Sequence, residues 1–133
     1  MEAKDRYFLR IAGIILALSA VILGAFGTHA LKDILTARNS TPVWETAVRY
    51  QMWHALALLI ISVFPEKQPV SRAPGRFLII GTFLFSGSLY ALATGAPRWV
   101  GPVTPMGDLF LMLGWALLLF SVCKGRKSSK NYS

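Results

Sequence analysis

The sequence predicts an all-α integral membrane bundle of four transmembrane helices, with both termini in the cytoplasm. Of its 133 residues, 54% are hydrophobic and only 15% are charged, whereas soluble domains carry about 25% charged residues. The charged residues cluster at the termini and in short intervening stretches, and they leave long apolar tracts between them. This composition excludes a disordered or collagenous chain. The single Cys123 excludes a disulfide-rich scaffold.

The first helix is predicted over residues 8–28. Residues 11–28 contain no charge and follow three basic side chains, Lys4, Arg6 and Arg10. An apolar tract of this length suits a membrane-spanning helix. A cleaved signal peptide is the alternative, since it also begins with a basic stretch followed by an apolar one. We favour the membrane helix because no large soluble segment follows and because residues 24–32 look like a helix end.

The second helix is predicted over residues 42–64. The apolar stretch 52–64 is too short to cross a hydrocarbon core of about 30 Å, so the helix must begin earlier. Thr41 offers an N-cap hydroxyl and Pro42 suits the first helical position, while Pro65 gives a natural stop. The first two turns, which carry charged residues, would then lie at or beyond the membrane interface.

The third and fourth helices are predicted over residues 77–96 and 105–123. The third tract has no charged residue, and Asp108 is the charged residue of the fourth. A threonine followed by a proline, at positions 104 and 105, is a good start for the fourth helix. The basic segment 124–133 that follows is predicted to be a flexible tail. The whole chain, 1–133, is predicted to be a single membrane domain.

The distribution of Lys and Arg predicts how four spans are oriented. The N-terminus, the loop between the second and third helices, and the C-terminal tail would share one side of the membrane and carry ten basic residues, whereas the other side would carry four: Lys32, Arg38, Arg49 and Arg98. Both termini should therefore be cytoplasmic. Cations that flank membrane spans and contact anionic headgroups explain the net charge of +8. Nucleic acid is not predicted as a partner, because the cations do not form a basic groove with interleaved aromatic residues.

Small residues at four-residue spacing are predicted to bring the helices together. In lipid, helix association depends on close backbone approach and on a few hydrogen bonds. The first helix offers Ala20, Gly24 and Thr28, and the third offers Gly87, Ala91 and Gly95. The third helix also has a polar edge that can form hydrogen bonds to a neighbour, made of Thr82, Ser86, Tyr90 and Thr94. The alternative is that this hydroxyl stripe lines a permeation path.

Five polar side chains are predicted to lie at a similar depth near the outer side: His29, Tyr50, Gln51, His54 and Asp108. The three on the second helix are three or four residues apart, so we expect them to share one face. An ionised aspartate is costly in hydrocarbon, so Asp108 should face protein or water. We expect a hydrogen-bonded structural cluster. A proton-handling or small-solute site is the alternative, since histidine titrates near neutrality.

Chemistry based on a metal, a cofactor or a serine nucleophile is not predicted. The two histidines are 25 positions apart, and the chain has no His-x-x-x-His pair, cysteine ligand pattern or c-type haem motif. It also lacks the Gly-x-Ser-x-Gly elbow of hydrolases. The glycine pair at 24 and 27 lies inside an apolar helix rather than at a strand-to-helix turn, so it is not a dinucleotide fingerprint.

Four segments resemble the motifs of a known family. They are residues 24–32 (GAFGTHALK), 49–58 (RYQMWHALAL), 85–93 (FSGSLYALA) and 101–107 (GPVTPMG), the last accompanied by Gly114-Trp115. This order resembles the small four-helix membrane proteins of domain-of-unknown-function family 423, which include transmembrane protein 256 of animals. The resemblance spans about residues 8–122. It departs at Asp108, where the family usually has a second glycine, which weakens a shared role for this carboxylate.

The resemblance implies a multi-pass protein of the bacterial plasma (inner) membrane and no settled activity. It favours His29 and His54 as important residues, because both lie inside matching motifs. We expect a non-enzymatic integral membrane component that contacts the lipid bilayer and either its own copies or other membrane proteins. The alternative is a small oligomeric transporter or a proton-linked channel subunit.

Overall fold

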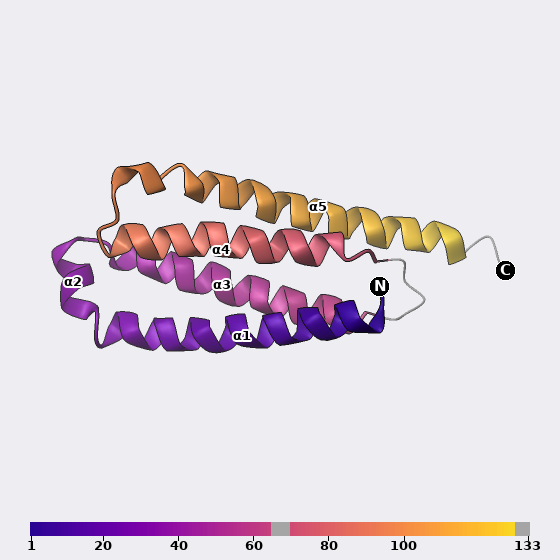
Figure 1. Cartoon of the computed structure of the whole chain (residues 1–133), viewed down its shortest axis with the longest axis horizontal. Coiled ribbons are helices and arrows are strands. Elements are labelled where there is room, and N and C mark those ends of the chain that lie inside the picture. The colour runs from indigo at the N-terminus through magenta and orange to yellow at the C-terminus, as the bar shows by residue number, and fades with distance from the viewer. Residues whose placement is uncertain (65–69, 130–133) are drawn as a thin grey trace.

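Long α-helices make up most of the protein. The computed structural model describes residues 1–64 and 70–129, with side chains described as far as residue 124. Its helices are α1 (Ala3–Thr28), α2 (Lys32–Ala37), α3 (Thr41–Ser62), α4 (Ala73–Ala93), the 3-10 helix η1 (Arg98–Val100) and α5 (Val103–Ser129) (Figure 1). These two described ranges contain no β-strand, which confirms the all-α prediction.

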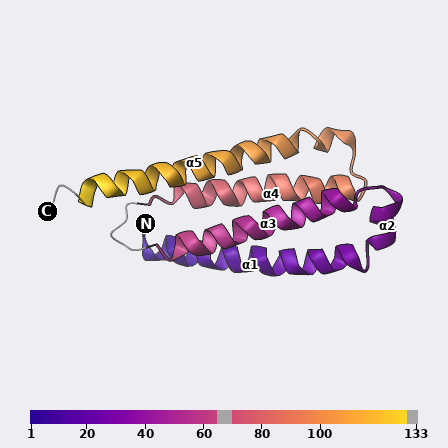
Figure 2. The same cartoon turned by 180° about the vertical axis from the view of Figure 1, so that it is seen from behind.

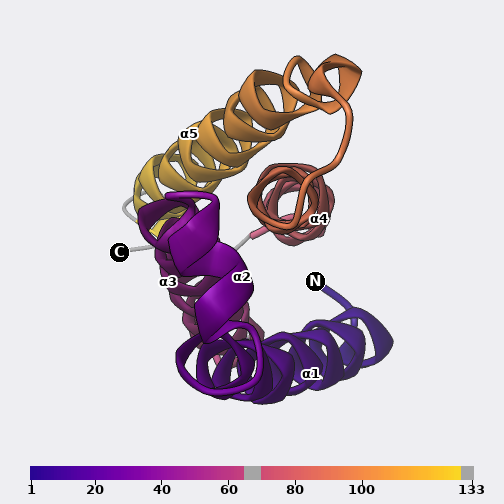
Figure 3. The same cartoon turned by 90° about the vertical axis from the view of Figure 1, so that its left-hand side faces the viewer.

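The four longest helices lie side by side in the order α1, α3, α4, α5. Helix α3 packs against both α1 and α4, and α5 packs against α4. The view along the helices shows that they follow a bent row rather than a closed ring around one centre (Figure 3). The short α2 lies across one end of the four helices, and the start of α1 and the end of α5 lie at the opposite end (Figure 2).

The helices extend beyond the apolar tracts that predicted them. Helix α1 begins at Ala3, α4 at Ala73 and α5 at Val103, each earlier than expected, because charged and polar residues can form helical turns outside the hydrocarbon. Helix α5 also continues to Ser129, where the sequence predicted a flexible tail. Lys and Arg have high helix propensity, so basic residues do not by themselves end a helix. Residues 130–133, the rest of that predicted tail, lie outside the described residues.

Two helices end earlier than predicted. Helix α3 ends at Ser62 rather than 64, and α4 ends at Ala93 rather than 96. Beyond α4, Gly95 adopts a φ of 105°, a conformation that favours glycine and ends a helix. The predicted stop at Pro65 and the basic residue Lys67 lie outside the described residues.

Three segments are long and apolar enough to cross a membrane: α1, α4, and the combined segment of η1 and α5 up to Lys124. Their outward faces carry large exposed apolar side chains, including Ile15 and Leu18 on α1 and Leu119 and Phe120 on α5. Helix α3 does not meet the same criterion, because Glu45, Arg49, Gln51 and His54 interrupt its apolar sequence. The long helix that fails this criterion is thus one of two helices that pack between two neighbours, the other being α4.

Close approach between helices occurs at glycines that the small-residue pattern did not identify. An added Cβ at Gly13 would lie 2.9 Å from the Ala55 carbonyl oxygen of α3, and one at Gly81 would lie 2.7 Å from Leu111 of α5. On α1, a Cβ at Gly27 would overlap the indole of Trp44. These positions leave no room for a side chain, so the helix spacing depends on them.

The prediction that Gly87, Ala91 and Gly95 pack against another helix of the chain is wrong. Gly87 is exposed, and a Cβ added there would meet nothing within 4 Å, while Gly95 lies beyond the helix end against the guanidinium group of Arg38. Ala91 is only partly buried. Four-residue spacing identifies one face of a helix, but it does not say which face meets a neighbour. Helix α4 presents other faces to α3 and α5 and leaves this one open.

The stripe on α1 is correct in part. Ala20 is fully buried, and an added Cβ at Gly24 would make an ordinary contact with Val48, at 3.5 Å. Thr28 is exposed, and its hydroxyl donates to the carbonyls of Gly24 and Ala25 in its own helix. Thr28 therefore ends the helix and does not join it to a neighbour.

The contrast between Gly107 and Gly87 predicts opposite effects of the same substitution. Gly107→Ala would drive a methyl group into the backbone of Phe85 and should lower the free energy of unfolding by about 1–3 kcal/mol. Gly87→Ala adds a methyl group in open space and should raise it by about 0.5–1 kcal/mol, because alanine favours helix. Reversible unfolding of both variants in detergent micelles tests this. Equal effects would contradict the packing described here.

Candidate functional site

Gln51 joins three helices inside the apolar core. Its side chain is 5% exposed on α3. Its Nε2 donates to the carbonyl of Leu16 at 3.0 Å and to the Ser19 hydroxyl at 2.7 Å, both on α1. Its Oε1 accepts a 2.9 Å hydrogen bond from the Tyr90 hydroxyl of α4. The amide thus uses both donors and its acceptor, which is the condition for a polar group to be stable away from water.

The polar edge of α4 divides between two roles. Ser86 donates to the carbonyl of Ala47 at 2.9 Å and Tyr90 donates to Gln51, so both form the predicted hydrogen bonds to a neighbouring helix. Thr82 and Thr94 instead donate to carbonyls of their own helix. The hydroxyl stripe is therefore occupied with protein partners.

His54 joins α3 to α5 through Nε2, while Nδ1 is held by a carbonyl of its own helix. Nδ1 lies 2.7 Å from the Tyr50 carbonyl oxygen, and the Trp115 indole Nε1 lies 3.1 Å from Nε2. A carbonyl only accepts and an indole N–H only donates, so Nδ1 carries the proton and Nε2 accepts. This arrangement holds the imidazole in the neutral form, because a doubly protonated ring could not accept from Trp115.

Aromatic rings surround His54. The Tyr50 ring lies 4.5 Å from the Phe85 ring of α4 and 5.2 Å from the Trp53 ring, measured between centroids. His54 and Trp115 meet edge to face at 6.1 Å. Beside them, a groove of about 450 Å³ opens between α3 and α5, with Asp108 on its wall together with His54. Asp108 is half-buried, as expected of a carboxylate that faces protein or water.

The predicted cluster is divided into separate groups. Gln51 and His54 are three residues apart and so point about 60° apart around the helix, which is enough for Gln51 to face α1 and α4 while His54 faces α5. The expectation of one shared face is therefore confirmed for Tyr50 and His54, which line the same groove, and is wrong for Gln51. His54 is also 13 positions into α3, about 20 Å from its start, so it is deeper than Asp108, which is near the start of α5.

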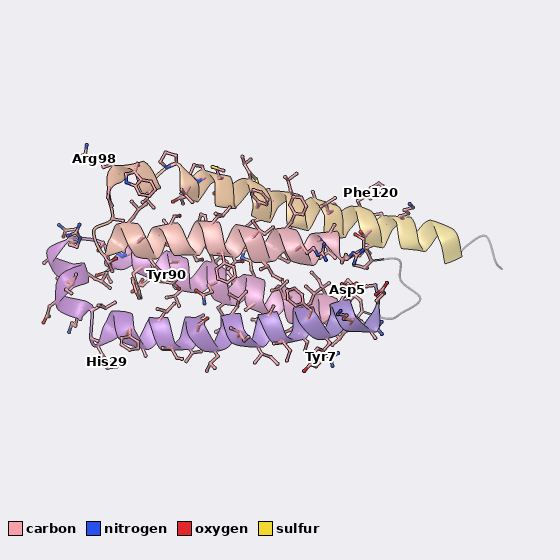
Figure 4. All side chains as sticks on the ribbon, viewed as in Figure 1. Asp5, Tyr7, His29, Tyr90, Arg98 and Phe120 are labelled. Carbon is pink, nitrogen blue, oxygen red and sulfur yellow. The ribbon has the colours of Figure 1, made fainter. Side chains whose placement is uncertain are left out.

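His29 does not join the other predicted residues. It is the exposed C-cap residue of α1, and its backbone N–H donates to the Ala25 carbonyl. The side chain lies at the end of the helix row near α2, away from Tyr90 (Figure 4). The prediction of a hydrogen bond between His29 and the His54 and Asp108 group is wrong, because the chain turns into α2 directly after this residue.

The first motif instead serves a contact that the sequence did not reveal. Trp44 is buried against Gly27, and its Nε1 donates to the Leu23 carbonyl at 2.9 Å. Its ring meets the Tyr90 ring edge to face at 4.7 Å, and Leu35 of α2 is buried in the same cluster. Indole groups in apolar segments need an acceptor. This requirement is the sequence feature that could have predicted hydrogen bonds from Trp44 and Trp115 to neighbouring helices.

The buried polar side chains have partners within the protein. Within the part of the chain that the structure describes, every buried side-chain nitrogen and oxygen has a hydrogen-bond partner. The same described residues hold no group of three or more His, Cys, Asp or Glu side chains suited to a metal ion. Among these side chains, Gln51, Ser86 and His54 link neighbouring helices through hydrogen bonds.

Apolar outward faces, three helices long enough to cross a bilayer, and polar groups satisfied inside the chain define an α-helical integral membrane protein. The chain belongs to the family described as protein of unknown function, DUF423, whose match covers residues 23–108. This confirms the resemblance seen in the sequence motifs.

Relatives are found in bacteria and in a fungus. The chain is 40% identical over 115 residues to a UPF0382 membrane protein of Staphylococcus haemolyticus, covering 86% of this chain and 93% of the relative. A UPF0382 membrane protein of Schizosaccharomyces pombe is 38% identical, with 77% and 90% covered, and one of Haemophilus influenzae is 33% identical, with 92% and 98% covered. No solved structure matches the chain.

Removing the Tyr90 hydroxyl should weaken the three-helix junction. Tyr90→Phe leaves the Gln51 carbonyl oxygen without this donor and should lower the free energy of unfolding by about 0.6–1.7 kcal/mol, the range found for hydrogen bonds between membrane helices. Tyr7→Phe is the matched control, since Tyr7 is 65% exposed and should change little. Unfolding in micelles measures both. An equal loss in the two variants would show that the junction is not stabilising.

Proposed function

We propose that the protein is a non-enzymatic, four-span component of the bacterial plasma membrane, with both termini in the cytoplasm, and that it acts through contacts with lipid and with other membrane proteins or its own copies. The observation that carries this proposal is the internal satisfaction of its polar groups. The Gln51 amide bonds to α1 and α4, and His54 bonds to Trp115 of α5 through Nε2 and to a carbonyl of its own helix through Nδ1. A catalytic or transport site would need such groups free to meet a substrate.

A fourth span by α3 is supported by its length and surroundings. At 22 residues it is about 33 Å long, which exceeds the hydrocarbon thickness of about 30 Å. Its buried polar residues face protein, and its charged pair, Arg49 and Glu45, lies in the first turns, 3.7 Å apart. Four spans also agree with the two termini at one end of the helix row (Figure 1).

The orientation is supported by charge. The end that holds both termini has Lys4, Arg10, Arg72 and Arg76 among its described side chains, and basic residues favour the cytoplasmic side. Reporter fusions provide the test. A fluorescent protein that folds only in the cytoplasm should be active at either terminus, and a periplasmic phosphatase should be active when inserted at Asn39, between α2 and α3. An active phosphatase at either terminus would contradict the topology.

A second candidate is a small oligomeric transporter or a proton-linked channel subunit. It is favoured by one observation, the groove between α3 and α5 that His54 and Asp108 share. Two ionisable groups beside a lateral opening are suited to proton exchange. In a single copy the groove lies at the side of the row, so a pathway through the membrane would require a second copy to close it.

Substitution of the two histidines separates these candidates. For a structural role, His54→Ala should lower thermal stability, because it leaves the Trp115 indole without its acceptor. His29→Ala is the matched control and should change little, since His29 is exposed. Vesicles containing the wild-type protein should show no proton flux under a pH gradient. Flux that disappears in a His54→Ala variant of normal stability would overturn the structural role and establish the transporter.

A further inference from the structure

A second lateral groove follows the side where α1 and α4 face each other. Both helices pack against α3, and the view along the row shows them on the same side of it (Figure 3). Near their first turns, α1 and α4 meet where Leu9 fills the space beside Gly75. Two hollows, one after the other, lie along this pair of helices.

The first hollow, at the end that holds the termini, combines charge with apolar surface. It has a volume of about 410 Å³ and is lined by Lys4, Asp5, Phe8, Arg76, Ile79 and Ile80. The Asp5 carboxylate lies 3.9 Å from the Arg72 guanidinium group, which compensates its charge. Lys4 and Arg76 form no ion pair with any residue that the structure describes, so the hollow retains two positive charges.

The second hollow lies deeper and is almost entirely apolar. It has a volume of about 240 Å³, and its walls include Ile15 and Leu16 of α1 and Phe83 and Gly87 of α4, with the satisfied side chain of Gln51 behind them. On α4 it begins at Thr82, two positions after Ile80 of the first hollow. Asp5 and Tyr90 lie toward the two ends of this side (Figure 4).

The spacing of the hollows matches the dimensions of one lipid molecule. From Lys4 to Ser19, which lines the deep hollow, α1 rises about 22 Å. Half of a bilayer, from headgroup region to midplane, is also roughly 20–22 Å. A lipid with its phosphate beside Lys4 and Arg76 would therefore extend an acyl chain to the deep hollow.

We propose that this groove binds one anionic phospholipid, with its phosphate held by Lys4 and Arg76 and an acyl chain lying along α1 and α4 past Gly87. The inference rests on the membrane integration proposed above and adds a specific ligand to it. Charge favours a lipid over a second copy of the chain, because a two-fold pair in one membrane shares the same orientation. Such a pair would bring the two cationic ends to the same level.

Lipid retention by the full-length protein tests the proposal. Protein purified in micelles that contain equal amounts of palmitoyl-oleoyl phosphatidylglycerol and phosphatidylcholine should retain one phosphatidylglycerol in native mass spectrometry. The double variant Lys4→Gln/Arg76→Gln should lower this affinity roughly 30-fold, since each cation near an anionic lipid contributes about fivefold. The matched control, Arg49→Gln/Arg98→Gln, removes two cations at the other end of the row and should leave retention unchanged.

A steric variant tests the acyl chain independently. Gly87→Leu places bulk in the deep hollow at a position where an added Cβ meets nothing within 4 Å, and it should reduce retention of either lipid. Ala116→Leu, on the exposed face of α5, is its control and should have no effect. If the charge variant does not fold, Gly87→Leu alone decides the question.

Two results would overturn the lipid site. One is equal retention of phosphatidylglycerol and phosphatidylcholine by the wild type, and the other is loss of retention in the control variants to the same extent as in the groove variants. Alkaline carbonate extraction of cell membranes that contain the wild-type chain tests the proposed membrane integration separately. Release of the wild-type chain from membranes would contradict membrane integration, whereas an inserted chain with no lipid preference would contradict the lipid site alone.

Discussion

Hydrocarbon offers no hydrogen bonds, and this constraint decides where α3 lies. A polar side chain in a membrane must find its partner within the protein, and α3 carries both Gln51 and His54 in its central turns. Placed between α1 and α4, with α5 within reach of its third side, the helix gives each of these groups a partner. Helix α4 also has two neighbours, whereas α1 and α5 can occupy the outer positions because their exposed side chains need only contact lipid.

Glycine determines how closely the other helices approach. Gly81 and Gly107 bring α4 and α5 together, while Gly13 and Gly27 do so for α1 and α3. In lipid there is no hydrophobic gain from helix association, so such close contacts supply much of the stability. The resulting row has two lateral grooves on opposite sides of α3, one containing His54 and Asp108 and the other leading from Lys4 to Gln51.

Most of the family motifs supply residues that hold the helices together. In the first motif, Gly27 makes room for Trp44, so the motif serves the junction of α1 and α3. The second motif contributes Gln51 and His54 to separate cross-links, and Gly114-Trp115 completes one of them. Helix packing thus explains these motif residues but not the exposed His29 and Gly87. Lys4 and Arg76 lie outside the four motif segments. A ligand site formed by those cations would be independent of the residues that maintain the fold.

Much of the secondary structure could be predicted from the sequence, because the apolar tracts and the Thr-Pro pair at the start of α3 are local signals. The tracts located all four long helices, and the polar edge of α4 correctly indicated hydrogen bonds to a neighbour through Ser86 and Tyr90. The ends of the helices were less predictable, since Lys and Arg end an apolar tract but do not end a helix.

The contacts between helices were decided by the tertiary structure. Spacing placed Gly87 in a packing stripe and His29 in a polar cluster, but packing left the first open and the second exposed. A sequence pattern indicates which residues share a face of one helix. A contact depends in addition on how two helices are rotated about their axes and on which helices are neighbours. The amino-acid sequence by itself therefore determined that this protein is helical and suited to a membrane, and only the packed structure decided which polar groups meet and where the grooves open.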